Sequence, residues 1–168
     1  MTRQWFLVFE GINQTKCTVA ITSGYYNPVH KGHISCFNAA KEIATRKSNG
    51  GQLFVIVNSD KQVKLKGSMP FMNEYERLFI VDSIKPVNYA FLSIDEDKTV
   101  CRTLDVLAEF LPDCNLIFCK GGDSTADNVP EQETCDRLGI GIVYNIGGEK
   151  VQSSSWLLNK LKKEEGNG

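Results

Sequence analysis

The stretch Gly24-Tyr-Tyr-Asn-Pro-Val-His30-Lys-Gly32-His33 decides the fold of this 168-residue chain. Before it, residues 18–22 are β-branched and apolar, which predicts a buried strand that Gly24 interrupts. After it, apolar residues recur at intervals of three and four from residue 34 to residue 44, which predicts a helix. The sequence therefore predicts a strand, a turn and a helix, with both histidines where the helix begins.

The histidines His30 and His33 are the strongest candidates for chemistry. Free backbone N–H groups and the helix dipole favour anionic phosphate oxygens at a helix start, and Gly32 lets the backbone approach a ligand. Imidazoles can donate hydrogen bonds to a phosphoryl group as its charge redistributes. Phosphate chemistry is the favoured interpretation. A pair of zinc ligands and a purely structural pair are the alternatives, although no acidic residue or cysteine nearby has a convincing ligand spacing.

Strands and helices alternate along the rest of the chain. Further strands are predicted at 52–58, 89–94, 115–119 and 140–145, and helices at 74–84, 99–110 and 153–163, with a polar loop over 59–72 and Asn73 as an N-cap. This order predicts one α/β domain, a Rossmann-like three-layer α/β/α fold with a five-stranded, mainly parallel sheet. We assign residues 16–163 to this domain, 1–15 to an N-terminal extension and 164–168 to a polar tail.

Polar residues follow several of the predicted strands. Ligands of parallel sheets bind beyond the carboxyl ends of the strands, where the strand order reverses, so these residues are expected to form one site with the histidines. Asp60 could instead cap a loop, the Gly-Gly-Asp segment could be a plain turn, and the serines could only cap a helix. The residues concerned are Asp60, Lys120, Gly121, Gly122, Asp123, Ser153, Ser154 and Ser155.

Composition indicates a globular protein without general attraction for nucleic acid or anionic membranes, because 42% of the residues are hydrophobic and the net charge is −1. No apolar run approaches the ~20 residues that span a bilayer, and the apolar patch at 5–9 is too short for a signal peptide. We therefore expect a cytoplasmic protein with reduced, mostly buried cysteines. These are Cys17, Cys36, Cys101, Cys114, Cys119 and Cys135.

The order of the motifs resembles the cytidylyltransferase-like nucleotidyltransferase superfamily, whose signature is HxGH. The match is greatest to the nucleotidyltransferase domain of bacterial ADP-heptose synthase, a sugar 1-phosphate adenylyltransferase, and glycerol-3-phosphate cytidylyltransferase is a close relative. The resemblance extends from about Lys16 to Leu161. Besides the histidine motif, it rests on Val57-Asn58-Ser59-Asp60, Leu65-Lys66-Gly67, Glu76-Arg77, Cys119-Lys120-Gly121-Gly122-Asp123 and Ser153-Ser154-Ser155.

The resemblance implies an enzyme that transfers AMP from ATP to a sugar 1-phosphate, such as a heptose 1-phosphate, and releases pyrophosphate. CTP with glycerol 3-phosphate or another phospho-alcohol is the alternative within the enzyme class, and a nucleotide-binding regulatory protein is the alternative outside it. Mg²⁺ would be carried by the triphosphate, with no metal ligand assigned to the protein. Neither nucleic acid nor membrane is an expected partner, and because relatives often self-associate, a homodimer is an expectation of the resemblance alone.

The same resemblance distributes roles among residues. The expected catalytic groups are His30, His33 and Lys66. The lysines could instead be solvated in a surface loop, and Arg77 could form an ion pair on a helix surface. The expected nucleotide-binding residues are Gly24, Tyr25, Tyr26, His30, Gly32, His33, Gly121, Gly122, Asp123, Ser153, Ser154 and Ser155, and the expected substrate-binding residues are Asp60, Lys64, Lys66, Arg77 and Lys120.

Two positions depart from the family pattern. Asn27 replaces the usual Asp, so any carboxylate role there is lost, and Ser124 stands where the heptose branch usually has an aromatic residue. The glycerol-phosphate branch has an arginine before its serine-threonine run, whereas residues 147–152 contain only Lys150 as a basic residue. This absence favours the heptose branch and ATP.

Overall fold

The computed structural model describes residues 17–148, and its centre is a five-stranded sheet in the order β3-β2-β1-β4-β5. All neighbouring strands are parallel. The predicted α/β Rossmann-like fold is therefore confirmed. The strands are β1 (Thr18–Gly24), β2 (Gln52–Val57), β3 (Tyr89–Leu92), β4 (Asn115–Gly121) and β5 (Gly141–Ile146), and the helices are α2 (Lys31–Lys47), α3 (Asp60–Leu65), α4 (Glu74–Asp82), α5 (Cys101–Phe110) and α6 (Gln132–Leu138).

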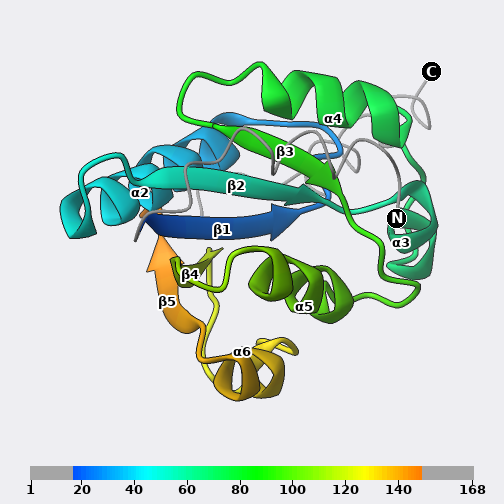
Figure 1. The fold of residues 1–168 in the computed structure, drawn as a ribbon. Helices are drawn as coiled ribbons and strands as arrows, with labels where there is room; N and C mark the ends of the chain where they lie inside the picture. The colour runs from blue at the N-terminus through cyan, green and yellow to red at the C-terminus, as the bar shows by residue number, and fades with distance from the viewer. Residues whose placement is uncertain (1–16, 149–168) are drawn as a thin grey trace, which may run out of the picture.

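Helices cover both faces of the sheet, so the protein has three layers (Figure 1). Successive residues of each strand face opposite layers. On β1, Val19 and Ile21 belong to the core shared with α5 and α6, whereas Ala20 belongs to the core shared with α2 and α4. Because strands buried on both faces need apolar residues throughout, the runs LFVIV in β2 and LIFC in β4 are continuous rather than alternating.

The strand order reverses between β1 and β4. From β1 the chain proceeds outward through β2 to β3, and it then crosses back to β4 on the other side of β1 and continues to β5. The carboxyl ends of β1 and β4 therefore flank the crevice in which open parallel sheets bind ligands. α3 lies at the arrowhead end of β2, near this edge (Figure 1).

Two helices differ from the sequence prediction. α3 occupies part of the segment predicted as a polar loop over 59–72, so the loop prediction is wrong for residues 60–65. Ser59 and Gln62 form a capping box that starts this helix, a local signal that the sequence contained. α6 was not predicted because only Cys135 of its residues is buried, which leaves almost no apolar periodicity. The predicted helix at 153–163 lies outside the described residues.

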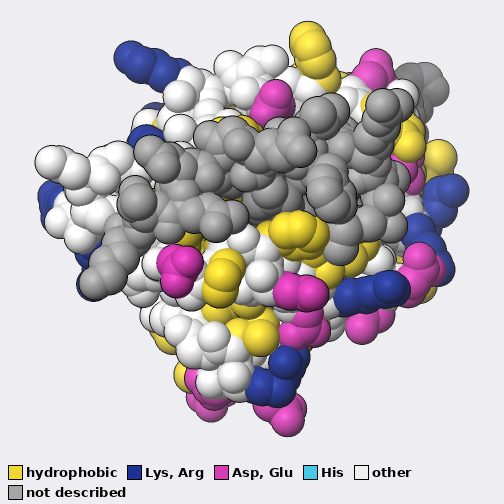
Figure 2. Space-filling view, viewed as in Figure 1, with side chains coloured by type: hydrophobic (Ala, Val, Ile, Leu, Met, Phe, Trp, Pro, Cys, Tyr) yellow, Lys and Arg dark blue, Asp and Glu magenta, His cyan; other side chains and the backbone are white. Residues whose placement is uncertain are grey.

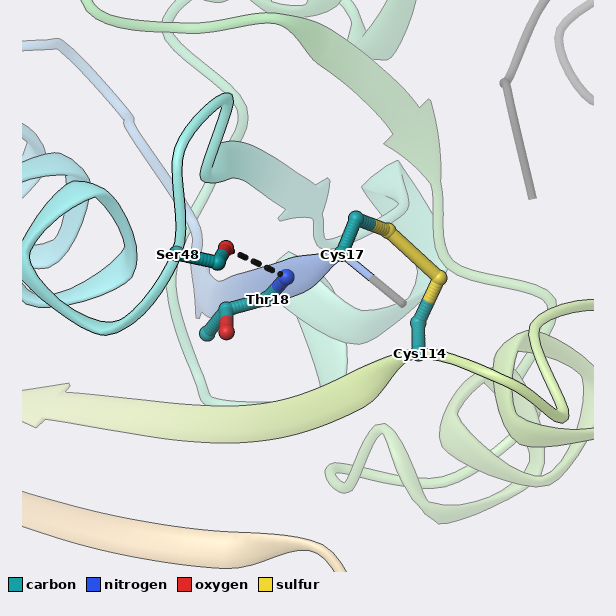
Figure 3. Close-up of a disulfide and its surroundings, with 4 residues drawn as sticks. All are labelled: Cys17, Thr18, Ser48 and Cys114. Atoms are coloured by element: carbon teal, nitrogen blue, oxygen red, sulfur yellow. Dashed lines mark hydrogen bonds between the residues drawn. A yellow bond between two sulfur atoms is a disulfide. The ribbon is translucent and has the colours of Figure 1, made fainter. Parts of the chain in front are cut away.

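A disulfide joins Cys17 to Cys114, so the expectation that all cysteines are reduced is wrong (Figure 3). The pairing follows from the sheet: Cys17 precedes β1 and Cys114 precedes β4, and the Asn115 amide donates to the Cys17 carbonyl at 2.8 Å. Their Cα atoms lie 4.9 Å apart. Of the remaining four cysteines, Cys119 and Cys135 are buried as expected, whereas Cys36 and Cys101 are partly exposed.

We expect thiol counting to detect this bridge. Alkylation of the denatured protein without reductant should modify four cysteines, because two are joined. Prior reduction should raise the count to all six. Intact-mass spectrometry reads both numbers directly. The double variant Cys17→Ser/Cys114→Ser is the control, and its count should be the same with and without reductant; six alkylated cysteines in the unreduced wild-type protein would contradict the pairing.

In the described part of the chain, no helix is both long and apolar enough to cross a membrane. On the face shown in Figure 2, basic and acidic side chains of the described residues are interspersed rather than gathered by sign. The described side chains visible on this face (Figure 2) therefore form no basic stripe of the kind that follows a nucleic-acid backbone.

Candidate active site

His30 and His33 form a stacked pair at the start of α2. Their ring centroids are 3.7 Å apart and the rings are inclined by 24°. His30 is the N-cap, and its Nδ1 accepts a hydrogen bond from the Gly32 amide at 3.2 Å, while His33 Nδ1 accepts one from the His30 amide at 3.2 Å. Because both Nδ1 atoms accept, the proton of each neutral ring is on Nε2. Each imidazole thus keeps an Nε2–H donor that the helix does not use.

Both imidazoles are held neutral. Burial lowers the pKa of His33 to about 3, with smaller contributions from His30 and from the positive charge of Lys66. Burial also lowers the pKa of His30. Buried imidazoles lose protons readily because the low-dielectric surroundings disfavour the charged form. The pair therefore offers neutral hydrogen-bond donors near physiological pH rather than two cations.

Tyr26 packs against the His33 ring. Its ring is almost fully buried, meets the His33 ring edge-on at 4.9 Å and contacts Phe37 at 5.4 Å. Tyr26 has a left-handed backbone with φ 49°, which is costly for an aromatic residue and fixes the direction of the ring. A Cβ on Gly24 would come within 2.8 Å of that ring. Of the two residues expected to bind nucleotide here, Tyr26 therefore packs against His33, and Gly24 packs against Tyr26.

Lys66 and Tyr25 lie beside the imidazole pair. The Lys66 ammonium is 4.4 Å from the centre of the Tyr25 ring, a cation–π contact, and its charge acts on His33. Burial raises the pKa of the Tyr25 hydroxyl, and the negative charge of Glu131 raises this pKa further. Lys66 is the C-cap of α3, and Lys64 is an exposed residue in the last turn of the same helix. The structure thus places Lys66, Tyr25 and the histidines together.

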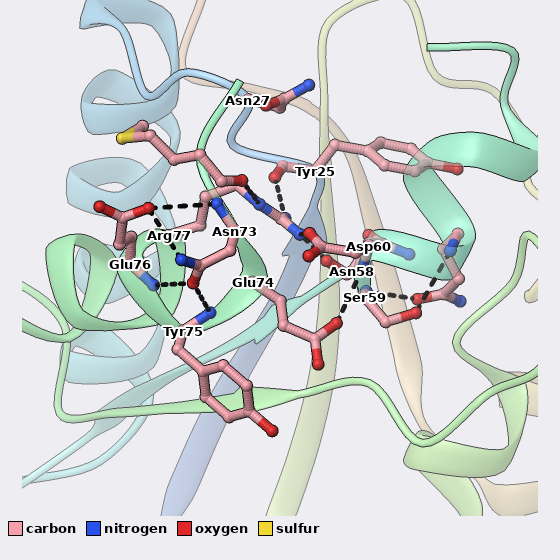
Figure 4. A network of polar contacts seen from close by, with 12 residues as sticks. Tyr25, Asn27, Asn58, Ser59, Asp60, Asn73, Glu74, Tyr75, Glu76 and Arg77 are labelled. Atoms are coloured by element: carbon pink, nitrogen blue, oxygen red, sulfur yellow. Dashed lines mark hydrogen bonds and ion pairs between the residues drawn. The ribbon is translucent and has the colours of Figure 1, made fainter. Parts of the chain in front are cut away.

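Arg77 is fully buried and fastens the turn after β1 to the neighbouring segments (Figure 4). Its Nη1 donates to the carbonyls of Tyr25 at 2.6 Å and Asn58 at 2.7 Å, and its Nε donates to the Met72 carbonyl at 3.1 Å. Nη2 pairs with the Asp60 carboxylate at 2.7 Å. Arg77 and Asp60, both expected to bind substrate, therefore form an ion pair beneath the site, and the surface ion pair considered for Arg77 is wrong.

Asn27 clamps the segment before α4 onto the histidine turn. Its side chain is buried, its Nδ2 donates to the Met69 carbonyl at 2.8 Å, and its Oδ1 accepts from the Phe71 amide at 2.6 Å. An amide can donate and accept in this way, whereas an ionised carboxylate only accepts. The departure from the family's Asp thus has a structural use in this chain.

We expect Asn27→Asp to destabilise the protein by about 1 to 3 kcal/mol, because it would set a carboxylate oxygen against the Met69 carbonyl and leave a buried acceptor unsatisfied. Urea denaturation would measure the change. Asn38→Asp is the matched control, since Asn38 is exposed on α2 and should tolerate the substitution. Equal stability of the two variants would show that the clamp contributes nothing.

The carboxyl end of β4 approaches α2 closely. A Cβ on Gly121 would lie 2.4 Å from the Cys36 sulfur, so only glycine allows this contact. The next residue, Gly122, has φ 67°, and Ser124 Oγ donates to the Gly121 carbonyl at 2.8 Å, which closes the turn. Asp123 is exposed beyond it. The predicted Gly-Gly-Asp segment is therefore brought to the helix that begins with the histidines.

Lys120 lies on the opposite face of β4, towards α5. Its ammonium is 5.0 Å from the centre of the Phe118 ring and 3.5 Å from a carboxylate oxygen of the buried Glu131. Sequence reasoning missed Glu131, because the residues it contacts are 11 and 31 positions away. The Pro-Glu pair before α6 was its only local signal. The serines at 153–155, expected to bind the triphosphate, lie outside the described residues.

Within residues 17–148, no group of three or more His, Cys, Asp or Glu side chains is arranged to hold a metal ion. The zinc interpretation of His30 and His33 therefore finds no third ligand in this part of the chain.

The geometry defines an α/β protein with hydrogen-bond donors and a lysine gathered at the switch point of a parallel sheet, an arrangement suited to phosphate groups. The chain belongs to the cytidylyltransferase-like family, whose model matches residues 21–152. It is thus a member of a nucleotidyltransferase superfamily whose enzymes act on a nucleoside triphosphate and a phosphorylated substrate and typically use Mg²⁺.

The proteins similar to this chain include HldE proteins and FAD synthases. The bifunctional protein HldE of Blochmanniella floridana is 30% identical over 88% of this chain but only 28% of its own length. The FAD synthase of Aciduliprofundum boonei is 30% identical over 71% of each chain. The chain thus spans about a quarter of the HldE proteins and most of the FAD synthases.

Among solved structures, the lipopolysaccharide core biosynthesis protein from Thermoplasma volcanium shares the fold. Its TM-score is 0.58 at 22% identity, and the match covers 77% of this chain and 96% of the other.

Proposed function

We propose that this protein transfers AMP from ATP to a phosphorylated acceptor, a sugar 1-phosphate such as a heptose 1-phosphate, and releases pyrophosphate. An acceptor phosphate oxygen attacks the α-phosphorus in line, a new P–O bond forms, and the bond to the β-phosphate bridging oxygen breaks. No side-chain nucleophile is needed, because positioning and charge stabilisation carry most of phosphoryl transfer. Mg²⁺ enters with the triphosphate as part of the substrate.

The single observation that carries this proposal is the pair of Nε2–H donors on His30 and His33. Both rings are locked by their Nδ1 hydrogen bonds and kept neutral by burial. Donors fixed in advance stabilise charge as it develops on a transferring phosphoryl group without reorganising. The ammonium of Lys66, next to His33, supplies positive charge at the same place.

Two other acceptor and donor pairs compete with the first choice. CTP with glycerol 3-phosphate is supported by the cytidylyltransferase-like family itself. FMN as an acceptor for AMP is supported by the FAD synthases, because their match covers most of their length rather than a small part. A nucleotide-binding regulatory protein is the alternative without turnover.

Pyrophosphate release tests these alternatives directly. The protein is incubated with ATP or CTP and with a heptose 1-phosphate, glycerol 3-phosphate or FMN, and each rate is compared with that of a His33→Asn variant. We expect ATP with the heptose 1-phosphate to give the highest kcat/KM. Higher turnover with CTP or with FMN would replace this proposal by the corresponding one. Binding of a triphosphate without turnover in any combination would favour the regulator.

A cytoplasmic location is part of the proposal, since nucleoside triphosphates are made and used there. A structural disulfide is uncommon in that reducing compartment. Alkylation of thiols at the moment of cell lysis would therefore show whether the bridge between Cys17 and Cys114 forms where the protein works.

A further inference from the structure

Glu131 is a buried carboxylate that the proposed mechanism does not use. It directly precedes α6 and is only 3% exposed. Its Oε1 accepts a hydrogen bond from the Val100 amide at 3.2 Å, and its Oε2 lies 3.5 Å from the Lys120 ammonium. A buried carboxylate is costly unless it is paired and hydrogen-bonded, and these two contacts supply the ion pair and the hydrogen bond.

Glu131 reaches the switch point through its contact with Lys120. Lys120 is near the carboxyl end of β4, and Tyr25 follows β1. After burial, the negative charge of Glu131 also contributes to the raised pKa of the Tyr25 hydroxyl. The Tyr25 ring in turn makes the cation–π contact with the Lys66 ammonium. Glu131 is therefore paired with a lysine near the carboxyl end of β4, the strand that neighbours β1 at the point where the strand order reverses.

The two contacts of Glu131 are directional. Because the Val100 amide fixes one oxygen, the other oxygen has a fixed place, and the flexible Lys120 side chain is drawn to it. The centre of the Phe118 ring lies 5.0 Å from the same ammonium, and this contact also restricts the Lys120 side chain. A lysine carries considerable rotamer entropy that must be lost before it can hold an anion in one geometry. Glu131 removes part of that freedom before a ligand arrives.

We propose that Glu131 is a positioning residue that holds the Lys120 ammonium at the switch point for the phosphate groups of the nucleoside triphosphate, an inference that rests on the proposed function. Lys120 contacts the substrate, and Glu131 acts only through Lys120. The prediction therefore concerns substrate affinity more than the rate of the chemical step.

Glu131→Gln is the sharpest variant, because its amide oxygen can still accept from Val100 while the charge opposite Lys120 disappears. Glu96→Gln is the matched control: Glu96 also pairs with a lysine, Lys61, but both side chains are largely exposed. The whole chain is labelled with an acetylating reagent, and mass spectrometry reports the rate at each lysine relative to the exposed Lys47.

We expect Glu131→Gln to raise the labelling rate of Lys120 about threefold or more, because loss of an ion pair frees the amine. Glu96→Gln should leave Lys120 unchanged. An unchanged rate at Lys120 in Glu131→Gln would overturn the proposal. This measurement needs no turnover, so it remains decisive even if the protein transfers no nucleotide.

Kinetics test the functional half of the proposal. Glu131→Gln should raise KM for ATP about fivefold and change kcat by less than about twofold, since an interaction made equally in ground and transition states affects KM alone. Glu131→Asp, which keeps the charge on a shorter side chain, should give an intermediate KM. A merely structural role would instead lower the active fraction at unchanged KM, and that result would overturn the proposal. Absence of turnover in the wild-type protein would contradict the proposed function, not the positioning of Lys120.

Discussion

Replacing His33 with asparagine is expected to lower kcat by about 10² or more, the usual cost of losing a preorganised donor to the transition state. Asparagine is chosen because its side-chain oxygen can still accept a hydrogen bond from the His30 amide. In the wild-type protein this amide donates to His33 Nδ1 at 3.2 Å. The Nε2–H donor is lost, but the helix cap is kept. Stability measured by thermal unfolding should therefore remain near that of the wild-type protein.

Two further variants separate the donor from the cap. Glutamine places an N–H near the position of the imidazole Nε2, so His33→Gln should retain more of the rate than His33→Asn. Alanine removes both the donor and the capping acceptor, so His33→Ala should lose the same rate and also stability, by about 1 kcal/mol. Steady-state kinetics with ATP would measure kcat and KM separately. Wild-type kcat in His33→Asn would remove the proposed role of this residue.

Replacing Arg77 with methionine is expected to destabilise the protein by about 3 to 5 kcal/mol, because it leaves the partly buried Asp60 carboxylate uncompensated and also removes the donor of several backbone carbonyls. Asp60 would lose its counter-charge, and the carbonyls of Tyr25 and Asn58 would lose their donor. Methionine keeps much of the volume of the arginine side chain, so the loss of polar contacts dominates the change. Urea denaturation would give the free energy of unfolding.

The control for this prediction is Arg46→Met on α2. Arg46 pairs with Glu42 one helical turn away, and both side chains are mostly exposed. Such pairs contribute only about 0.3 to 0.5 kcal/mol. Arg77→Lys, which keeps the charge but not the fork of donors, should lie between the two and remain measurable if Arg77→Met does not fold. A loss below about 1 kcal/mol in both Arg77 variants would contradict the role assigned to this side chain.

Local signals predicted most of the sheet. The first strand, the turn with the two histidines and the helix after it were predicted, because apolar periodicity and glycine both act over a few residues, although β1 continues to Gly24 instead of being interrupted by it. The N-cap role of Asn73 is also confirmed, since its Oδ1 accepts from Tyr75 and Glu76. α6 could not be predicted in this way, because Cys135 is the one buried residue of this short helix, which leaves almost no apolar periodicity.

Contacts between distant segments explain what the sequence did not reveal. Arg77 reaches Tyr25 across 52 positions, and Asn27 reaches Phe71 across 44. Neither residue differs from an exposed polar residue when only its neighbours in the chain are considered. The Cys17–Cys114 bridge spans 97 positions and depends on the β1–β4 pairing, which no local pattern specifies. The residues that position the site were therefore harder to predict than the residues that face it.

The bridge between Cys17 and Cys114 also has a topological consequence. It converts most of the sheet into a closed ring of chain, since β1, β2 and β3 and the helices between them all lie within the 97 positions that it spans. A single proteolytic cut inside that ring would leave the two fragments covalently attached. Such nicked molecules would migrate as one species on a denaturing gel until a reductant separates them.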